Sequence, residues 1–125
     1  MVKATPVGEP YSCLITDATH QLIADTTSDK GGNDNGFRPH ELLEAALASC
    51  LTISLRMYLE NQGIKIDSCS VTVELDRSNP DKTVFRKKVE LNGAISESDR
   101  KRIEAVLASC PVQKTLSKEL AFVLE

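Results

Sequence analysis

Residues 39–61 predict one long helix, and its composition limits how the rest of the chain can fold. Pro39 is tolerated in a first helical turn, two early glutamates suit the positive end of the helix dipole, and Gly63 is placed to end the helix. The middle of the run has almost no polar face, so the helix should be buried on most sides. In so small a protein one sheet covers one side, and we expect a second copy of the chain to cover the other in an obligate dimer.

Shorter patterns around this helix predict strands and two further helices. The predicted strands occupy residues 11–16, 21–24, 69–76, 85–91 and 120–124. Glycines and asparagines mark 26–37 as a loop. Ser96 should cap a helix that runs to Ser109, and Pro111 should begin a short third helix. The resulting order, β-β-α-β-β-α-α-β, indicates an α+β fold, and the length suits a single domain over residues 1–125.

Composition excludes several classes of function. The net charge of −3 and an aromatic content of 4% argue against a nucleic-acid partner. No uncharged apolar stretch of 18 residues occurs and the N-terminus has no apolar signal core, so we expect no membrane partner and a cytoplasmic protein. The chain lacks CxxC and HxxxH spacings and nucleotide-binding, serine-hydrolase and zincin motifs, so we expect neither metal nor cofactor.

Cys110 is a candidate reactive thiol because of its expected place at a helix start. It would occupy the N-cap position of the helix begun by Pro111, where unpaired N–H groups and the dipole favour a thiolate. Lys114, one turn further on, is close enough to assist. The alternative is that Cys110 is a small buried apolar residue at a kink.

Cys50 is a second candidate, in the middle of the long helix. Its apolar surroundings would raise the pKa of its thiol and make it inert unless a cation or a hydrogen-bond donor reaches it. We find neither on its own helix face, since Arg56 lies far round the helix. Arg38 or a residue of a partner chain could supply one, and plain packing is the alternative. Cys13 and Cys69 fall in strand patterns and look structural.

Two separated motifs, each with a cysteine, resemble a known family. Residues 36–50 read GFRPHELLEAALASC and residues 110–116 read CPVQKTL. They resemble the central-helix motif and the second cysteine motif of the OsmC/Ohr family (osmotically inducible protein C and organic hydroperoxide resistance proteins). The resemblance implies an OsmC-like intertwined homodimer, with antiparallel sheets around two long central helices.

The resemblance also implies a reaction, the thiol-dependent reduction of organic hydroperoxides. In such proteins the first cysteine, here Cys50, becomes a sulfenic acid, and the second, here Cys110, condenses with it to a disulfide. A dithiol reductant, often lipoyl-linked, restores both thiols. The family's peroxidases carry a glutamate directly after the helix-starting proline, where this chain has His40 followed by Glu41. They also carry an arginine in the N-terminal strands, and Arg38 is the first arginine here. Arg38 is therefore the candidate replacement for that arginine, and either Glu41 or His40 is the candidate replacement for the glutamate.

Two other functions remain open on the sequence. The departures near the helix start fit a dimer that binds a small apolar ligand at its interface without catalysis, with the thiols as packing residues. A redox sensor that signals through the same disulfide is the third possibility.

Overall fold

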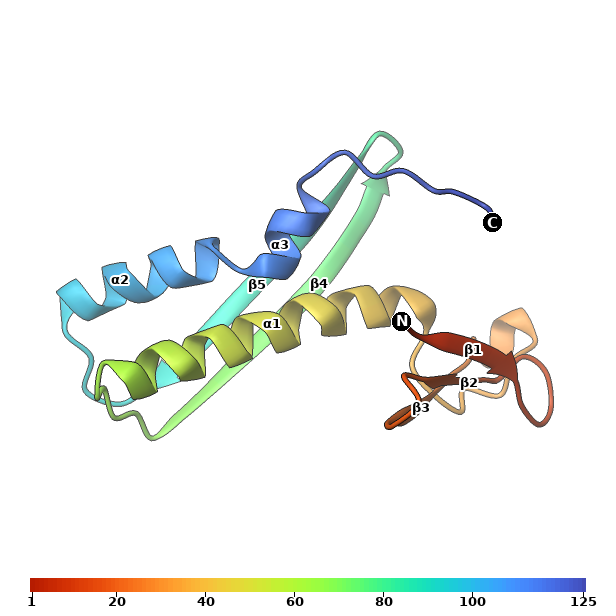
Figure 1. The fold of residues 1–125 in the computed structure, drawn as a ribbon, viewed down its shortest axis with the longest axis horizontal. Coiled ribbons are helices and arrows are strands. Elements are labelled where there is room, and N and C mark those ends of the chain that lie inside the picture. Colours follow the sequence, from red (N-terminus) through yellow and green to blue (C-terminus); the bar gives the residue numbers. More distant parts are fainter. The chain divides into compact units, whose positions relative to one another are not determined.

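A computed structural model describes residues 1–125, which form two compact units, Met1–Leu43 and Glu44–Glu125. The elements in chain order are β1 (Lys3–Pro6), β2 (Cys13–Thr16), β3 (Gln21–Ala24), the 3-10 helix η1 (Ser28–Lys30), α1 (Pro39–Asn61), β4 (Ser68–Asn79), β5 (Lys82–Asn92), α2 (Glu97–Ala108) and α3 (Pro111–Leu116) (Figure 1). Both sheets are antiparallel, so the predicted α+β class is confirmed. The single domain over residues 1–125 stays a prediction.

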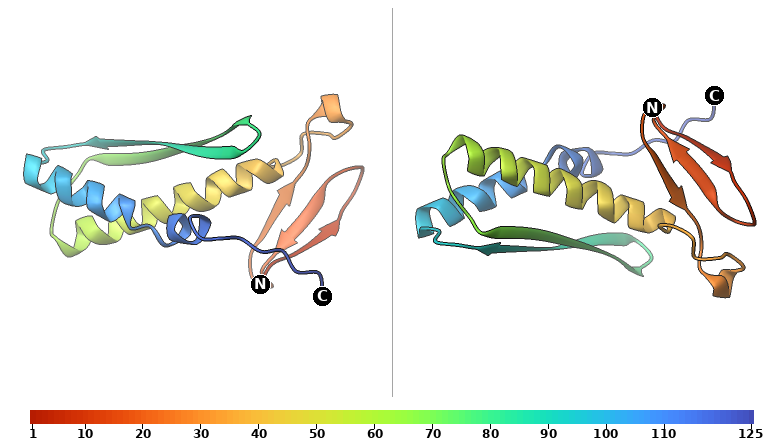
Figure 2. Two further views of the ribbon diagram at one scale, coloured as in Figure 1. Left: turned by 90° about the horizontal axis from the view of Figure 1, so that it is seen from above. Right: turned by 90° about the horizontal axis from the view of Figure 1, so that it is seen from below.

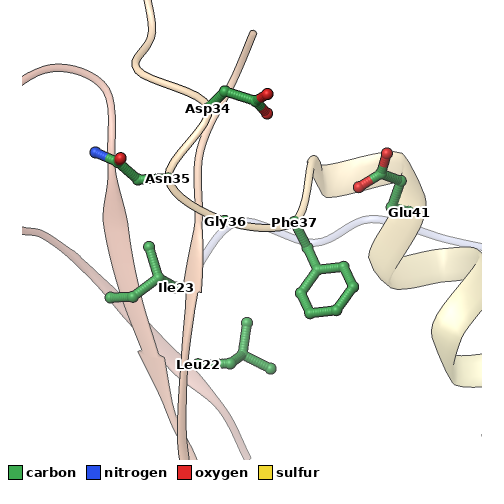
Figure 3. Close-up of a pocket in the computed structure, with 7 residues that line it drawn as sticks. All are labelled: Leu22, Ile23, Asp34, Asn35, Gly36, Phe37 and Glu41. Atoms are coloured by element: carbon green, nitrogen blue, oxygen red, sulfur yellow. The ribbon is translucent and has the colours of Figure 1, made fainter.

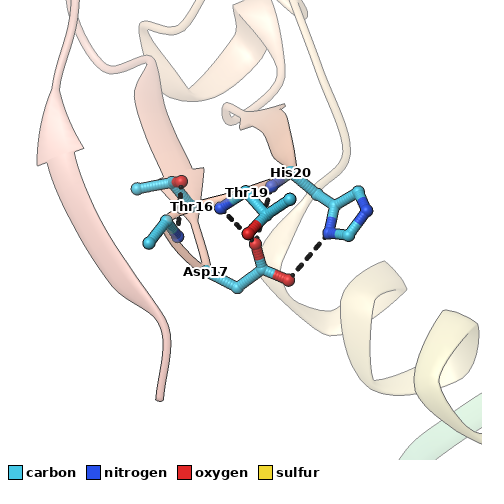
Figure 4. A network of polar contacts seen from close by, with 5 residues as sticks. Thr16, Asp17, Thr19 and His20 are labelled. Atoms are coloured by element: carbon cyan, nitrogen blue, oxygen red, sulfur yellow. Dashed lines mark hydrogen bonds and ion pairs between the residues drawn. The ribbon is translucent and has the colours of Figure 1, made fainter.

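The first unit contains a three-stranded sheet in the order β1-β2-β3. The predicted strands at 11–16 and 21–24 are present as β2 and β3, but the sequence did not predict β1, whose residues include a lysine and a proline and form no apolar run. Pairing with β2 makes it a strand, since the cross-strand context outweighs intrinsic preference. The turn between β2 and β3 is held by Asp17, which accepts hydrogen bonds from the N–H of Thr19 (2.9 Å) and contacts His20 Nδ1 (3.0 Å) (Figure 4).

A buried carboxylate organises the loop over residues 26–37. Asp25 is 3% exposed and accepts hydrogen bonds from the Ser12 hydroxyl at 3.0 Å and from the N–H groups of Thr26 (2.7 Å), Asn33 (3.2 Å) and Asn35 (3.1 Å). The predicted loop is therefore confirmed, and it is attached by the Asp25 side chain and by backbone hydrogen bonds, such as that from the N–H of Phe37 to the carbonyl of Ile23 at 3.1 Å.

Helix α1 matches its prediction at both ends. Pro39 is its first residue, and after Asn61 the chain enters Gly63 with φ +64°, the left-handed conformation in which glycine ends helices. The N–H of Ile64 then donates to the carbonyl of Leu59 at 2.9 Å. By length and composition alone α1 could cross a membrane, a test that the core helix of a globular protein also passes.

The second unit packs helices against one face of a long hairpin. Strands β4 and β5 pair antiparallel and turn at residues 80–81, and both run further than the strands predicted at 69–76 and 85–91. Helices α1 and α2 lie on the same side of this hairpin (Figure 2). The Glu44 carboxylate of α1 accepts the N–H of Leu75 in β4 at 2.7 Å, which ties the helix to the strand.

Four leucines of α1 at a spacing of four residues form the centre of the second unit. They divide between two buried clusters. The first holds Leu47, Leu51, Val73 and Cys110, and the second holds Leu55, Leu59 and Ile103. Because Ile103 lies in α2 and Cys110 lies directly before α3, these clusters hold both C-terminal helices onto α1.

The two C-terminal helices begin as the sequence predicts. The Ser96 hydroxyl accepts the N–H of Asp99 at 3.1 Å and caps α2, and Pro111 is the first residue of α3. The prediction of an edge strand over 120–124 is wrong, because those residues form no strand. Leu120, Phe122 and Leu124 are 54%, 93% and 100% exposed. An alternating pattern of apolar residues forms a strand only where the edge of a sheet is available to pair with it, and this segment pairs with no strand of its own chain.

Candidate active site

The two cysteines of the resembling motifs lie together in the second unit. Cys110 is fully buried in the cluster with Leu47, Leu51 and Val73, and Cys50 packs against that cluster from α1. The two thiols are close enough for each to shift the pKa of the other. The structure thus brings together two thiols that are sixty residues apart in the sequence.

Local sequence explains how each sulfur reaches this place. Cys50 lies one residue before Leu51 and three after Leu47, so the buried leucine stripe of α1 turns its side chain toward the hairpin side of the helix. Pro111 disfavours helical geometry at the residue before it, so α2 ends at Ala108 and Cys110 takes an extended conformation (φ −54°, ψ 126°) at the start of α3.

The surroundings of Cys50 lower the pKa of its thiol. Burial alone would raise this pKa, but three donors outweigh it: the Cys110 thiol, the backbone N–H of Val112 and the hydroxyl of Ser54. Each of them stabilises the thiolate form by hydrogen bonding to its negative charge. The expectation of no hydrogen-bond donor on the helix face of Cys50 is wrong, since Ser54 follows one turn later on that face. Its spacing was the available signal.

Cys110 has the opposite character. Burial raises the pKa of its thiol, the hydrogen bond to Cys50 raises it further, and the N–H groups of Gln113 and Val112 only partly offset these effects. The expectation of a thiolate favoured by its helix-start position is therefore wrong, since desolvation and the neighbouring sulfur outweigh the N–H groups. Its side chain makes no helix-capping hydrogen bond, and the exposed Lys114 is not among the groups that shift its pKa. The pair is thus asymmetric, with Cys50 as the better thiolate and Cys110 as the proton donor.

The other two predicted site residues lie in the first unit and contact each other. The Arg38 guanidinium pairs with the Glu41 carboxylate at 2.8 Å, and the backbone N–H of Arg38 donates to the same carboxylate at 3.0 Å. These bonds to Arg38, its backbone N–H first, lower the pKa of Glu41. Arg38 occupies the position before Pro39, so Glu41 also satisfies an N–H at the start of α1, as in a capping box. The charge of Arg38 is held in place by this pair.

Beside this ion pair lies an open pocket of about 580 Å³ (Figure 3). Its wall combines apolar side chains from β3 with the polar end of the loop that leads into α1. The lining residues are Leu22, Ile23, Asp34, Asn35, Gly36, Phe37 and Glu41. Gly36 has no room for a side chain, because a Cβ there would stand 2.1 Å from the carbonyl oxygen of Ile23. The loop must therefore carry glycine at that point.

The remaining cysteines belong to strands. Cys13 belongs to β2 in the first unit, and Cys69 belongs to β4 and packs against the cluster around Leu55 and Leu59. No group of three or more His, Cys, Asp or Glu side chains is arranged to hold a metal ion.

A family model described as OsmC-like protein matches residues 31–125, which include both cysteine motifs and the whole second unit. The chain belongs to the OsmC-like family. Among curated proteins, no sequence matches this chain.

Solved structures share the fold of this OsmC-like protein at low sequence identity. An OsmC-like protein from Mycoplasma pneumoniae is 23% identical, with a TM-score of 0.75 over 93% of this chain and 85% of the other. The organic hydroperoxide resistance protein OhrB of Bacillus subtilis is 22% identical, with a TM-score of 0.62 over 95% and 92%. An organic hydroperoxide resistance protein from Elizabethkingia anophelis is 19% identical, with a TM-score of 0.65 over 95% and 89%. These likenesses support the fold.

Proposed function

We propose that this OsmC-like protein reduces organic hydroperoxides with Cys50 as the attacking thiolate and Cys110 as the resolving thiol. The packing of both cysteines at one buried cluster carries the proposal, because it places a thiol of lowered pKa beside one of raised pKa. Thiolates, not thiols, attack peroxides, and a neighbouring thiol traps the sulfenic acid that results. The names of two structural relatives, which are called organic hydroperoxide resistance proteins, are consistent with this substrate class.

The proposed reaction has three steps. The Cys50 thiolate attacks a peroxide oxygen, the O–O bond breaks, and the leaving alkoxide takes up a proton and departs as an alcohol. Cys50 is then a sulfenic acid. The Cys110 sulfur attacks the Cys50 sulfur, an S–S bond forms, and the hydroxyl group leaves with the Cys110 proton as water. A dithiol compound, of which a lipoyl-linked dithiol is one example, reduces the disulfide and is itself oxidised.

Arg38 and Glu41 belong to the proposal as groups that complete the site. The guanidinium of Arg38 would stabilise the Cys50 thiolate, and Glu41 would hold that guanidinium in one orientation through the pair described above. The apolar lining of the thiol pair favours alkyl over hydrogen peroxide.

The proposal includes a cytoplasmic homodimer of one domain per chain. Ile53 and Met57 of α1 are each 59% exposed, although they belong to a helix that is apolar nearly all round. A second copy of the chain would cover these side chains, as the composition of α1 predicts.

Consumption of cumene hydroperoxide with dihydrolipoamide as reductant tests the assignment. Cys50→Ser should abolish turnover, and Cys69→Ser, outside the pair, should leave it unchanged. Cys110→Ser should lower turnover, because the external dithiol must then reduce the Cys50 sulfenic acid directly. Unchanged turnover in Cys50→Ser contradicts the proposal. Titration of thiols after one equivalent of peroxide separates the alternatives: rapid loss of two thiols per chain supports the enzyme, and slow loss of all four supports a binding protein.

A further inference from the structure

One charged side chain stands on the apolar face of the hairpin. Alternate residues of β5 face the helices, and among Phe85, Lys87, Val89 and Leu91 the lysine is the exception. Its cross-strand partner is Val73, which is buried in the cluster that contains Cys110. Residues directly opposite each other in an antiparallel pair project from the same face, so Lys87 projects toward the side of the hairpin that carries the thiol pair.

Lys87 reaches across this face to α3. Its ammonium donates a hydrogen bond to Oε1 of Gln113 at 2.7 Å. The two neighbouring cations of β5 are engaged elsewhere, since Arg86 pairs with Asp76 and Lys88 pairs with Glu90, each at 2.8 Å. Gln113 is therefore the partner of the one cation of this run that projects toward the helices.

Gln113 belongs to the short helix α3, which begins directly after Cys110. Helix α3 has only six residues, Pro111–Leu116, so little of its own hydrogen bonding fixes its position. Val112 packs against the same buried cluster as Cys50, and the N–H groups of Val112 and Gln113 lower the pKa of the Cys110 thiol. A contact that fixes Gln113 therefore fixes the donors around the thiols.

We propose that Lys87 is a positioning residue for Cys50: by holding the Gln113 side chain, it keeps the first turn of α3, with the Val112 N–H, against the thiol pair. As a role in catalysis, this rests on the proposed function. The contact itself, and its effect on the thiols, exist whether or not the protein turns over peroxide.

The other charged side chains on the elements around the thiol pair either bind another group or are exposed to solvent. The Glu44 carboxylate on α1 accepts the N–H of Leu75, and Arg56 on α1 is exposed. Glu104 on α2 and Lys114 on α3 are exposed. The face of β4 that meets the helices carries Val71, Val73 and Leu75 and no charge. These groups make no contact with Lys87 or Gln113 that a substitution would break. A change in the pKa of Cys50 in a Lys87 or Gln113 variant therefore reports on the Lys87–Gln113 contact.

The test is the pH dependence of Cys50 alkylation by iodoacetamide, followed by peptide mass spectrometry in chains with Cys13 and Cys69 replaced by serine. Lys87→Met and Gln113→Leu should each raise the apparent pKa of Cys50 by about 0.5 unit, and slow alkylation about threefold below that pKa, as expected for one weakened hydrogen bond. The double variant should shift it no further than either single variant. Lys87→Arg, which keeps the donor and the charge, should restore the original value.

Lys88→Met is the matched control, because Lys88 lies next in sequence on the opposite face of β5 and should leave the pKa unchanged. An unchanged pKa in both Lys87→Met and Gln113→Leu overturns the proposal. A shift in Lys87→Met without one in Gln113→Leu also overturns it, since the charge alone would then act. If the pKa responds as expected but no peroxide is consumed, the proposed function fails and the positioning role stands.

Discussion

Replacing Leu51 by alanine tests the packing that carries the thiol pair. Leu51 is 0% exposed and lies in the cluster with Leu47, Val73 and Cys110. The substitution removes buried methyl and methylene groups between α1 and the hairpin, where the surrounding backbone can collapse only partly into the space. Buried Leu→Ala changes cost about 2–5 kcal/mol, and full burial among helix, hairpin and α3 residues places this one at about 3 kcal/mol.

The assay is thermal and urea unfolding of Leu51→Ala beside Ile53→Ala. A loss of about 3 kcal/mol should lower Tm by roughly 10–15 °C in a chain of this size. Ile53 is 59% exposed on the same helix, so its truncation should cost less than about 1 kcal/mol within one chain. If the proposed dimer covers Ile53, its cost should be larger and should change with protein concentration, whereas the cost at Leu51 should not.

A loss below about 1 kcal/mol for Leu51→Ala would refute this reasoning, because the leucine stripe of α1 would then not be the core of the second unit. Leu51→Ala and Ile53→Ala could also lower the free energy of unfolding by equal amounts that do not change with protein concentration. That result would contradict both the packing of Leu51 against the hairpin and the dimer.

Three further predictions concern polar contacts. Glu44→Ala should cost about 1–2 kcal/mol in urea unfolding because it leaves the Leu75 N–H without its acceptor, whereas Glu44→Gln, which keeps an acceptor oxygen, should cost less. Burial would raise the pKa of Asp25, but the four hydrogen bonds that its carboxylate accepts lower this pKa. The carboxylate should therefore stabilise the fold above about pH 4, and this contribution should disappear as the pH falls. Asp25→Asn should flatten the acid dependence of the urea midpoint. Ser96→Ala should cost about 1 kcal/mol, measured by circular dichroism during unfolding, because the Asp99 N–H loses its cap.

The sequence predicted the elements whose signals are long or chemically specific. The helix at 39–61 has a proline at its start and a glycine after its end, and its bounds were predicted correctly. The strands at 69–76 and 85–91 have many alternating residues and were also predicted, although both are longer in the structure. β1 and the segment at 120–124 show the limit, because a strand exists only with its partner. Lys3–Pro6 has a weak pattern and a partner, and 120–124 has a clear pattern and no partner in the chain.

The candidate site divides in the same way. That Cys50 and Cys110 would act together followed from the family resemblance, since no local pattern states which residues meet in space. Local reasoning assigned the thiolate character to Cys110 from its helix-start position, and the structure assigns it to Cys50. Burial and the sulfur of Cys50 raise the pKa of Cys110, and neither effect can be deduced from the residues adjacent to Cys110 in the sequence.

Cys110 is completely buried and Cys50 is less buried, so the two sulfurs of the proposed disulfide differ in their access to a reductant. If that bond forms, an external thiolate can approach only from the Cys50 side. The mixed disulfide in the recycling step would then join the reductant to Cys50 and release Cys110, the thiol of higher pKa and so the slower leaving group. A reductant with a second thiol adjacent to the first would complete the exchange within one encounter, before the released Cys110 could reverse it.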